Sequence, residues 1–472
     1  MLFYQNLPML KRFETYFEFT RLGTNWRTEI LAGVTTFLTM AYIVLVNPAI
    51  LAASGMPLAA VTAATCLSAA FGSILMGIVA RYPIALAPGM GLNAYFTYTV
   101  CLKMHIPWQT ALGAVFLSGC IFIALTAAGI RQMILRSIPH ELYAAVASGI
   151  GLFIAFIGFR NAGLVIADHE TLVGLGKLRN PTTALALLGL ILMVALEVKK
   201  VRGSILVGVL TTTAIAWGLA FTILHTGSPA TNAQPDLSQS GLAQSWAQSL
   251  VHWTPAPGGF HALAATAFQL DIRGALNKGL LEIVFVFFFV DLFDNLGTLV
   301  AVTKRAGLIS HDHSIPRLNK ILLADATATV FGSLTGTSTV TSYVESTAGV
   351  MAGGRSGVTA IVTGLLFLGG IVAAPFVGIV PPAATAPALI LVGSLMLATI
   401  TEIRWTDPLV AVPSFLTLIL IPLTYSIANG LGFGIIAWAV LHIATGRARR
   451  QDWLLYILAA LFLARFIYLG TS

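Results

Sequence analysis

Acidic side chains within long apolar runs are the residues of this sequence whose types and spacing could do chemistry. Asp291 and Asp294 lie three residues apart in the apolar run 279–303, on one face of a helix. Glu345 lies in a second run, among serines and threonines. A carboxylate at the centre of a bilayer costs about 2.5 to 3.5 kcal/mol even on insertion scales. A buried carboxyl group can also be neutral and exchange a proton near physiological pH, so these three acids are candidates for ligand binding and proton coupling.

Two segments of unusual composition stand where such a site would need exposed backbone groups. Segment 82–94 contains Pro88, Gly89 and Gly91, which would interrupt a membrane helix, and Asn93 follows them. Segment 336–346 is rich in Ser and Thr, which compete with helical hydrogen bonds. An interruption cannot face lipid, because its backbone groups would be unpaired. We therefore expect two half-helices whose N-termini meet at a polar ligand near the midplane. Kinks needed only for packing are the alternative. The tenth span begins at Thr341 and Ser342, which are further candidate ligand-binding residues.

The composition requires a membrane around most of the chain. Of 472 residues, 57% are hydrophobic and 9% are charged, and the mean hydropathy is +0.88. Soluble domains carry about a quarter charged residues, so this composition excludes an ordinary aqueous fold. The first twenty residues contain no apolar core with a small-residue cleavage site, so we expect no removable signal peptide.

Apolar runs of spanning length recur along the chain and predict an all-α membrane protein of about fourteen helices. Seven spans on each side of one polar segment favour a 7+7 inverted repeat. Similar short stretches, 71–75 and 331–334, precede the two interrupted spans, the third and the tenth. A fifteenth run, 453–469, could span, lie on the surface or reflect a wrongly divided helix. The predicted spans are 28–50, 60–80, 84–100, 108–130, 142–164, 182–199, 203–226, 279–303, 319–335, 341–353, 357–380, 386–402, 409–427 and 430–446.

The positions of the charged residues predict the orientation. The net charge of +8 comes from short loops, and most Lys and Arg fall on one side if the N-terminus is cytoplasmic. The excess of Lys and Arg therefore indicates the orientation of the chain in the membrane, and we expect no nucleic-acid partner. The three cysteines lack paired or ligand spacing and predict packing residues. The group 311–313, His-Asp-His, is better explained as a solvated turn than as a metal site, so we expect no metal or cofactor.

At these residues the chain resembles the AzgA-like purine permeases, a branch of the nucleobase:cation symporter family that also includes uracil and xanthine permeases. The resemblance extends from segment 28–42 to segment 422–426. Its most specific parts are 87–94, 290–294 and 343–346.

The resemblance implies a core domain, a gate domain and a base bound between the third and tenth spans. It implies that Asp294 and Glu345 contact the base, that Asn93 and Gly91 shape the pocket, and that Asp291 matches an acid important in some members. The aspartate at position 291 favours a hypoxanthine/guanine permease, whereas the segments 148–154 and 161–163 are closer to adenine permeases. The resemblance therefore does not decide which purine is the preferred substrate. The implied divisions are 1–27 (cytoplasmic N-terminus), 28–130 and 279–380 (core), 131–226 and 381–446 (gate), 227–278 (outer loop) and 447–472 (basic turn and terminal hydrophobic helix).

The sequence therefore predicts a secondary transporter, not an enzyme, that imports purine nucleobases by proton symport with alternating access across a bacterial inner membrane. The expected partners are a purine base, protons and the lipid bilayer, with a homodimer as a compatible assembly. The proton gradient takes the place of a cofactor. An anion exchanger or channel of the same fold is one alternative, and a membrane-embedded enzyme is a second, although no nucleophile or cofactor motif has suitable spacing.

Overall fold

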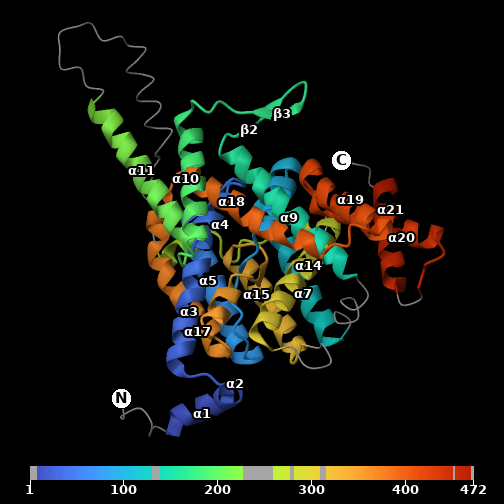
Figure 1. The fold of residues 1–472 in the computed structure, drawn as a ribbon, viewed down its shortest axis with the longest axis horizontal. Helices are drawn as coiled ribbons and strands as arrows, with labels where there is room; N and C mark the ends of the chain where they lie inside the picture. The colour runs from blue at the N-terminus through green and yellow to red at the C-terminus, as the bar shows by residue number, and fades with distance from the viewer. Residues whose placement is uncertain are drawn as a thin grey trace.

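The computed structural model describes residues 8–129, 139–226, 259–276, 281–308, 315–449 and 452–468. Within these residues the chain is almost entirely helical (Figure 1). In the described part of the chain, nine helices are long and apolar enough to cross a membrane. Three shorter apolar helices lie at 283–292, 408–424 and 453–467. The predicted fold class, an all-α membrane protein, is therefore confirmed.

The first half of the chain contains β1, one of the two central strands. Its elements are α1 (Pro8–Tyr16), α2 (Phe19–Leu22), α3 (Trp26–Met40), α4 (Ile43–Ala52), α5 (Leu58–Leu75), the π-helical η1 (Met76–Ala80), β1 (Leu86–Pro88), α6 (Met90–Ala94), the π-helical η2 (Tyr95–Lys103), α7 (Trp108–Ala127), α9 (His140–Asn161), β2 (Val165–Asp168), β3 (Leu172–Leu175), α10 (Pro181–Val198) and α11 (Ser204–Thr226).

The second half of the chain contains β4, the other central strand. Its elements are the 3-10 helix η3 (Gly259–Ala265), α13 (Ile272–Ala275), α14 (Leu281–Ala306), α15 (Leu318–Thr335), β4 (Val340–Ser342), α16 (Ser346–Met351), α17 (Gly357–Gly370), η4 (Ile371–Ile379), α18 (Pro382–Met396), η5 (Leu397–Glu402), α19 (Pro408–Thr424), α20 (Ile427–Ala444) and α21 (Trp453–Tyr468). Residues 227–258 of the expected outer loop and the group 311–313 lie outside the described residues.

Strands β1 and β4 join the two halves at the centre of the molecule. They are antiparallel, with Leu86 opposite Ser342 and Pro88 opposite Val340. The backbone bonds continue past both strand ends, because Gly89 N–H donates to Thr339 O and Tyr343 N–H donates to Ala85 O, each at 3.0 Å. A pair of short strands can lie within a bundle because each helps to satisfy the backbone of the other.

Each central strand is held by a hydroxyl from the helix that precedes it. Ser73 of α5 accepts from Leu86 N at 2.9 Å and donates to Leu86 O at 3.1 Å. Thr329 of α15 accepts from Val340 N at 3.2 Å and donates to Val340 O at 2.9 Å. The same double contact therefore occurs once in each half.

The short sequence similarity between the halves has a direct structural counterpart. Phe71 and Phe331 stack on each other with ring centroids 4.0 Å apart. Gly72 and Gly332, the residues that follow them, leave room for Leu86 and Val340, since a Cβ at either glycine would lie within about 3 Å of those side chains. The similar stretches 71–75 and 331–334 thus pack together at the boundary between the halves.

The helices fall into two groups by their packing. In the first group α5, α14 and α15 pack on the strand pair, α7 packs on α14 and α15, and α17 packs on α5 and α3. In the second group α9, α10, α11, α18, α19 and α20 pack mainly on one another. Helix α21, from the terminal apolar run, packs on α20 (Figure 1). Its Phe462 is buried and meets Phe285 of α14 edge to face, with ring centroids 5.5 Å apart.

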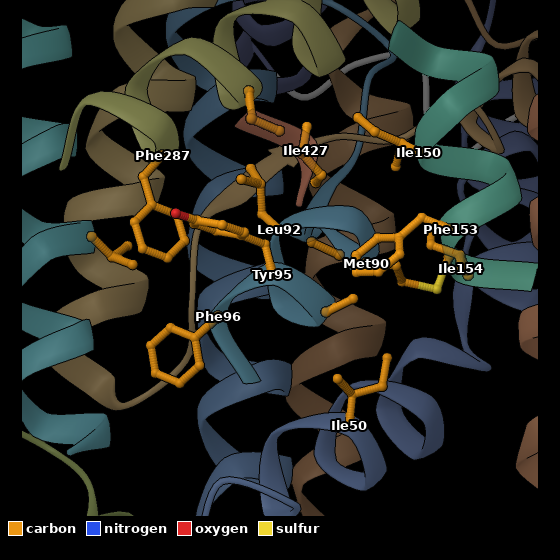
Figure 2. Close-up of a cluster of buried hydrophobic side chains, with 14 of the residues drawn as sticks. Ile50, Met90, Leu92, Tyr95, Phe96, Ile150, Phe153, Ile154, Phe287 and Ile427 are labelled. Atoms are coloured by element: carbon orange, nitrogen blue, oxygen red, sulfur yellow. The ribbon is translucent and has the colours of Figure 1, made fainter. Parts of the chain in front are cut away.

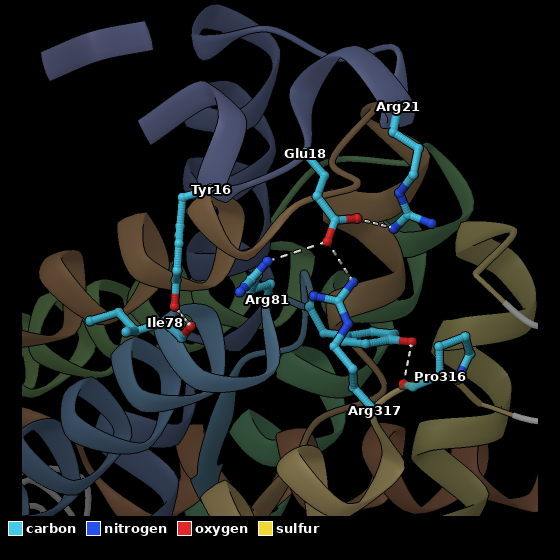
Figure 3. A network of polar contacts seen from close by, with 8 residues as sticks. Tyr16, Glu18, Arg21, Ile78, Arg81, Pro316 and Arg317 are labelled. Atoms are coloured by element: carbon cyan, nitrogen blue, oxygen red, sulfur yellow. Dashed lines mark hydrogen bonds and ion pairs between the residues drawn. The ribbon is translucent and has the colours of Figure 1, made fainter. Parts of the chain in front are cut away.

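The N-terminal segment covers the ends of α5 and α15. Glu18 forms ion pairs with Arg21, with Arg81 at 3.4 Å and with Arg317 at 3.3 Å (Figure 3). The Tyr16 hydroxyl donates to Ile78 O at 2.8 Å. One carboxylate therefore links the N-terminus to both halves of the bundle.

Candidate substrate site

The segments predicted to be interrupted both consist of a strand followed by a helix. Strand β1 leads through Gly89 into α6 and then η2, while β4 leads through Tyr343 to α16. Because β1 and β4 are antiparallel, the two helices leave the strand pair in opposite directions. The first amide groups of a helix have no partner within that helix and favour negative charge or ligand acceptors. This arrangement directs such groups from both halves toward one region.

Glu345 lies at the start of α16 and is half-buried. Its Oε1 accepts a hydrogen bond from the hydroxyl of Tyr42 at 2.6 Å. Tyr42 is fully buried between α3 and α4, the two parts of the first span. Among the described residues, Tyr42 is the one side chain that donates to this carboxylate.

Helix α14 brings the other predicted acids to the same region, because it packs against both α16 and β4. Asp291 is fully buried in this helix. Asp294 lies one turn further along its backbone, and its side chain lies outside the described residues. Neighbouring Asn295 is buried and accepts a hydrogen bond from Ser342 at 2.9 Å. Ser342 therefore anchors β4 to the helix that carries the acids.

Asn93 belongs to a buried polar network that connects the halves. It donates to Asn47 Oδ1 and accepts from the hydroxyl of Ser338. The Nδ2 of Asn47 in turn donates to Thr65 at 2.7 Å and to Thr337 at 3.1 Å. All five side chains are fully buried. In this structure Asn93 thus holds the half-helix α6 in position relative to the second half.

The remaining predicted site residues differ in their surroundings. Gly91 faces Ile150 of α9 so closely that a Cβ would overlap that side chain, so a glycine is required for this helix contact. Thr341 lies opposite Ala87 in the strand pair, and its buried hydroxyl has no hydrogen-bond partner among the described residues. That hydroxyl is therefore available to a ligand.

The half-helix of the first half is embedded in apolar side chains. Figure 2 shows Met90, Leu92 and Tyr95 surrounded by residues from other elements, including Ile150 and Phe287. The ring of Tyr95 meets that of Phe287 of α14 edge to face, with centroids 5.3 Å apart. Such surroundings exclude water and strengthen the few polar contacts that a ligand could make.

Four residues near the site were not predicted from the sequence as site residues: Tyr42, Asn47, Asn295 and Ser338. Asn47 could have been found, because an amide beside Pro48 in an otherwise apolar span is rare. Tyr42 gave no comparable signal, since a tyrosine in a membrane span is common and its partner is distant in the sequence. Thr341 lies on β4, and Glu345 lies at the start of the half-helix α16 that follows this strand. A carboxylate and a hydroxyl this close in the chain suit a flat ligand with N–H groups on its edge.

Comparisons with known proteins identify the family of the chain. The sequence profile of the Permease family matches residues 27–409. The guanine/hypoxanthine permease PbuG of Bacillus subtilis (strain 168) is 42% identical over 465 residues, covering 97% of this chain and 100% of that protein. The adenine permease AdeP of Escherichia coli (strain K12) is 40% identical over 456 residues, which cover 97% of this chain and 96% of AdeP.

The fold resembles that of a solved transporter with little sequence similarity. The transmembrane domain of a cyanobacterial bicarbonate transporter, BicA, superimposes with a TM-score of 0.59 at 17% identity, covering 86% of this chain and 97% of that domain. Identity at this level supports a shared fold only. The coverage and identity of the permeases carry the assignment: the chain belongs to the Permease family, within the nucleobase permeases that include the AzgA-like purine permeases.

Proposed function

We propose that this permease imports purine nucleobases by proton symport. The observation that carries the proposal is the half-buried carboxylate of Glu345, which lies at the start of α16 beside the central strand pair and accepts a hydrogen bond from Tyr42. The names of PbuG and AdeP supply the substrate class, since one is a guanine/hypoxanthine permease and the other an adenine permease.

The chemistry of a purine base matches the groups at this site. Ring N–H groups of the base donate to Glu345 and Asp294, and ring nitrogen or carbonyl groups accept from exposed amides at the half-helix starts and from the hydroxyl of Thr341. A site whose buried groups are paired by the correct ligand rejects an analogue that leaves them unpaired. Gly91 and Ser342 shape this site, and Asn93 joins its two halves through the hydrogen bond from Ser338.

The acids of the site support proton coupling. A purine is uncharged, so the driving force must enter through another group. Protonation of Asp291, Asp294 or Glu345 as the base binds would remove a negative charge from the site. The loaded site could then move across the membrane at lower cost, because an ionised carboxylate is costly within the bilayer.

The two groups of helices support alternating access. We infer that residues 28–130 and 279–380 form a core domain that carries the base, and that 131–226 and 381–446 form a gate domain against which it moves. The packing of the helices into these two groups supports this division. The distribution of Lys and Arg supports an inner-membrane protein with a cytoplasmic N-terminus.

Uptake of labelled hypoxanthine, guanine and adenine into cells that lack their own purine permeases tests the proposal. Glu345→Ala and Asp294→Ala should abolish uptake while the amount of protein in the membrane is unchanged. Glu170→Ala is a matched control, because this acid is exposed in the β2–β3 turn. Normal uptake by both site variants would contradict the site.

Two additions to the same assay test the coupling and the alternative substrate. An uncoupler should stop accumulation of the base, and continued accumulation would exclude proton symport. Bicarbonate and sulfate should not compete with the base, whereas competition by either anion would favour an anion transporter of this fold.

A further inference from the structure

The first membrane span has a break that places one tyrosine at the candidate site. Helix α3 ends at Met40 and α4 begins at Ile43, inside the span from Trp26 to Ala52. Tyr42 lies in this break and is fully buried. The break is closed by short-range bonds, such as that from Val44 N to Ala41 O at 3.1 Å, so the backbone stays satisfied within the membrane.

The packing of α3 against α16 fixes Tyr42 relative to Glu345. A Cβ at Gly349 of α16 would overlap the hydroxyl of Thr36 of α3 and would lie 2.8 Å from Ala32 O. These helices therefore approach as closely as a glycine allows. This close contact brings together the two segments that carry Tyr42 and Glu345, and Tyr42 Oη lies 2.6 Å from Glu345 Oε1.

The role of the Tyr42 hydroxyl differs from that of its neighbour Tyr343. Tyr343 donates to the backbone oxygen of Pro88 at 2.5 Å and so stabilises the strand pair. Tyr42 donates to a carboxylate oxygen, where a hydrogen bond is charge-assisted and directional. The bond holds one oxygen of Glu345 and thereby sets the direction in which the other oxygen, Oε2, points.

We propose that Tyr42 is a positioning residue for base binding. It holds the Glu345 carboxylate in the one orientation in which Oε2 accepts a ring N–H of the base. This proposal rests on the proposed function. Without the hydroxyl, Glu345 rotates among several positions, and binding a base must restrict it again, which lowers affinity.

Transport by Tyr42→Phe in proteoliposomes tests this role. The variant keeps the ring and its packing, and we expect KM for the preferred base to rise about tenfold, the size of a hydrogen bond to a charged group, with little change in the maximal rate. Tyr82→Phe is the matched control, because Tyr82 is also buried and donates to Pro316 O at 2.8 Å. We expect its KM to equal that of the wild type.

A double-mutant cycle separates positioning from a general structural effect. Glu345→Asp withdraws the carboxylate by one methylene from Tyr42, so Tyr42→Phe added to Glu345→Asp should change KM less than about twofold. Equilibrium binding of the labelled base to solubilised protein gives the same comparison for variants with slow uptake.

The outcomes are distinguishable. An unchanged KM in Tyr42→Phe, a lower rate at unchanged KM, or a full tenfold effect in the Glu345→Asp background would overturn the role of Tyr42 while purine transport stands. Absence of purine transport by the wild-type protein would instead refute the proposed function.

Discussion

Replacement of Asn47 by leucine removes the centre of the polar network that joins the two halves. Leucine has a similar shape, so the change tests hydrogen bonding rather than packing. Three bonds are lost, to Thr65, Thr337 and Asn93. Hydrogen bonds between membrane helices average about 0.6 kcal/mol, which gives about 2 kcal/mol for the three.

The partners that remain add to this cost. Thr65 still donates to Val61 O at 2.6 Å, but the amide N–H group of Asn93 loses its acceptor within a fully buried site. An unsatisfied buried donor costs about 1 to 3 kcal/mol. We therefore expect Asn47→Leu to lower the free energy of unfolding by about 3 to 5 kcal/mol.

Thermal unfolding of purified protein in detergent, together with KM for the base, measures this effect. Asn161→Leu is the control, because Asn161 is exposed and makes one long bond, to Tyr98 at 3.4 Å. Its midpoint should stay near that of the wild type. If Asn47→Leu unfolds at the same temperature as Asn161→Leu and binds base normally, then the network does not hold the half-helices and our reasoning is wrong.

Three further predictions concern residues outside the base contacts. Glu29→Gln should lower the midpoint of thermal unfolding without changing KM. This buried carboxylate accepts hydrogen bonds from Thr24, from two backbone N–H groups and from Thr359, and the NH2 group of a glutamine would face some of these donors. An unchanged midpoint would contradict this. Ser73→Ala and Thr329→Val should each cost about 1 to 2 kcal/mol of stability and raise KM to a similar extent, since each removes the same pair of strand contacts; an effect in one half only would exclude equivalent roles. Hydrogen bonds from Thr171, through its backbone and hydroxyl, and from Glu170 hold the pKa of Asp168 below its usual value. At any pH above the usual pKa of an aspartate, the carboxylate therefore stabilises the β2–β3 turn, and this effect is lost only as the pH falls through the lowered pKa. The rate of proteolysis at the turn should be constant from about pH 5 to 8, and it should be higher in Asp168→Asn.

The sequence alone determined the class of the protein and the position of its unusual segments. Apolar runs of spanning length need no knowledge of tertiary contacts, because the bilayer imposes their length and composition. Pro88 and Gly89 likewise indicated an interruption locally, since their backbone properties do not depend on distant residues. The acids of the α14 segment and Glu345 were identified because charge within lipid is costly wherever it occurs.

Only the tertiary structure decided which residues meet. Tyr42 and Glu345 are 303 positions apart, and Asn93 and Ser338 are 245 apart, yet each pair forms a hydrogen bond. These contacts depend on the pairing of β1 with β4 and on the close packing of α3 with α16. Neither is encoded in a local pattern, because a three-residue strand has no partner preference of its own and a buried tyrosine satisfies its hydroxyl with whatever acceptor the fold brings near.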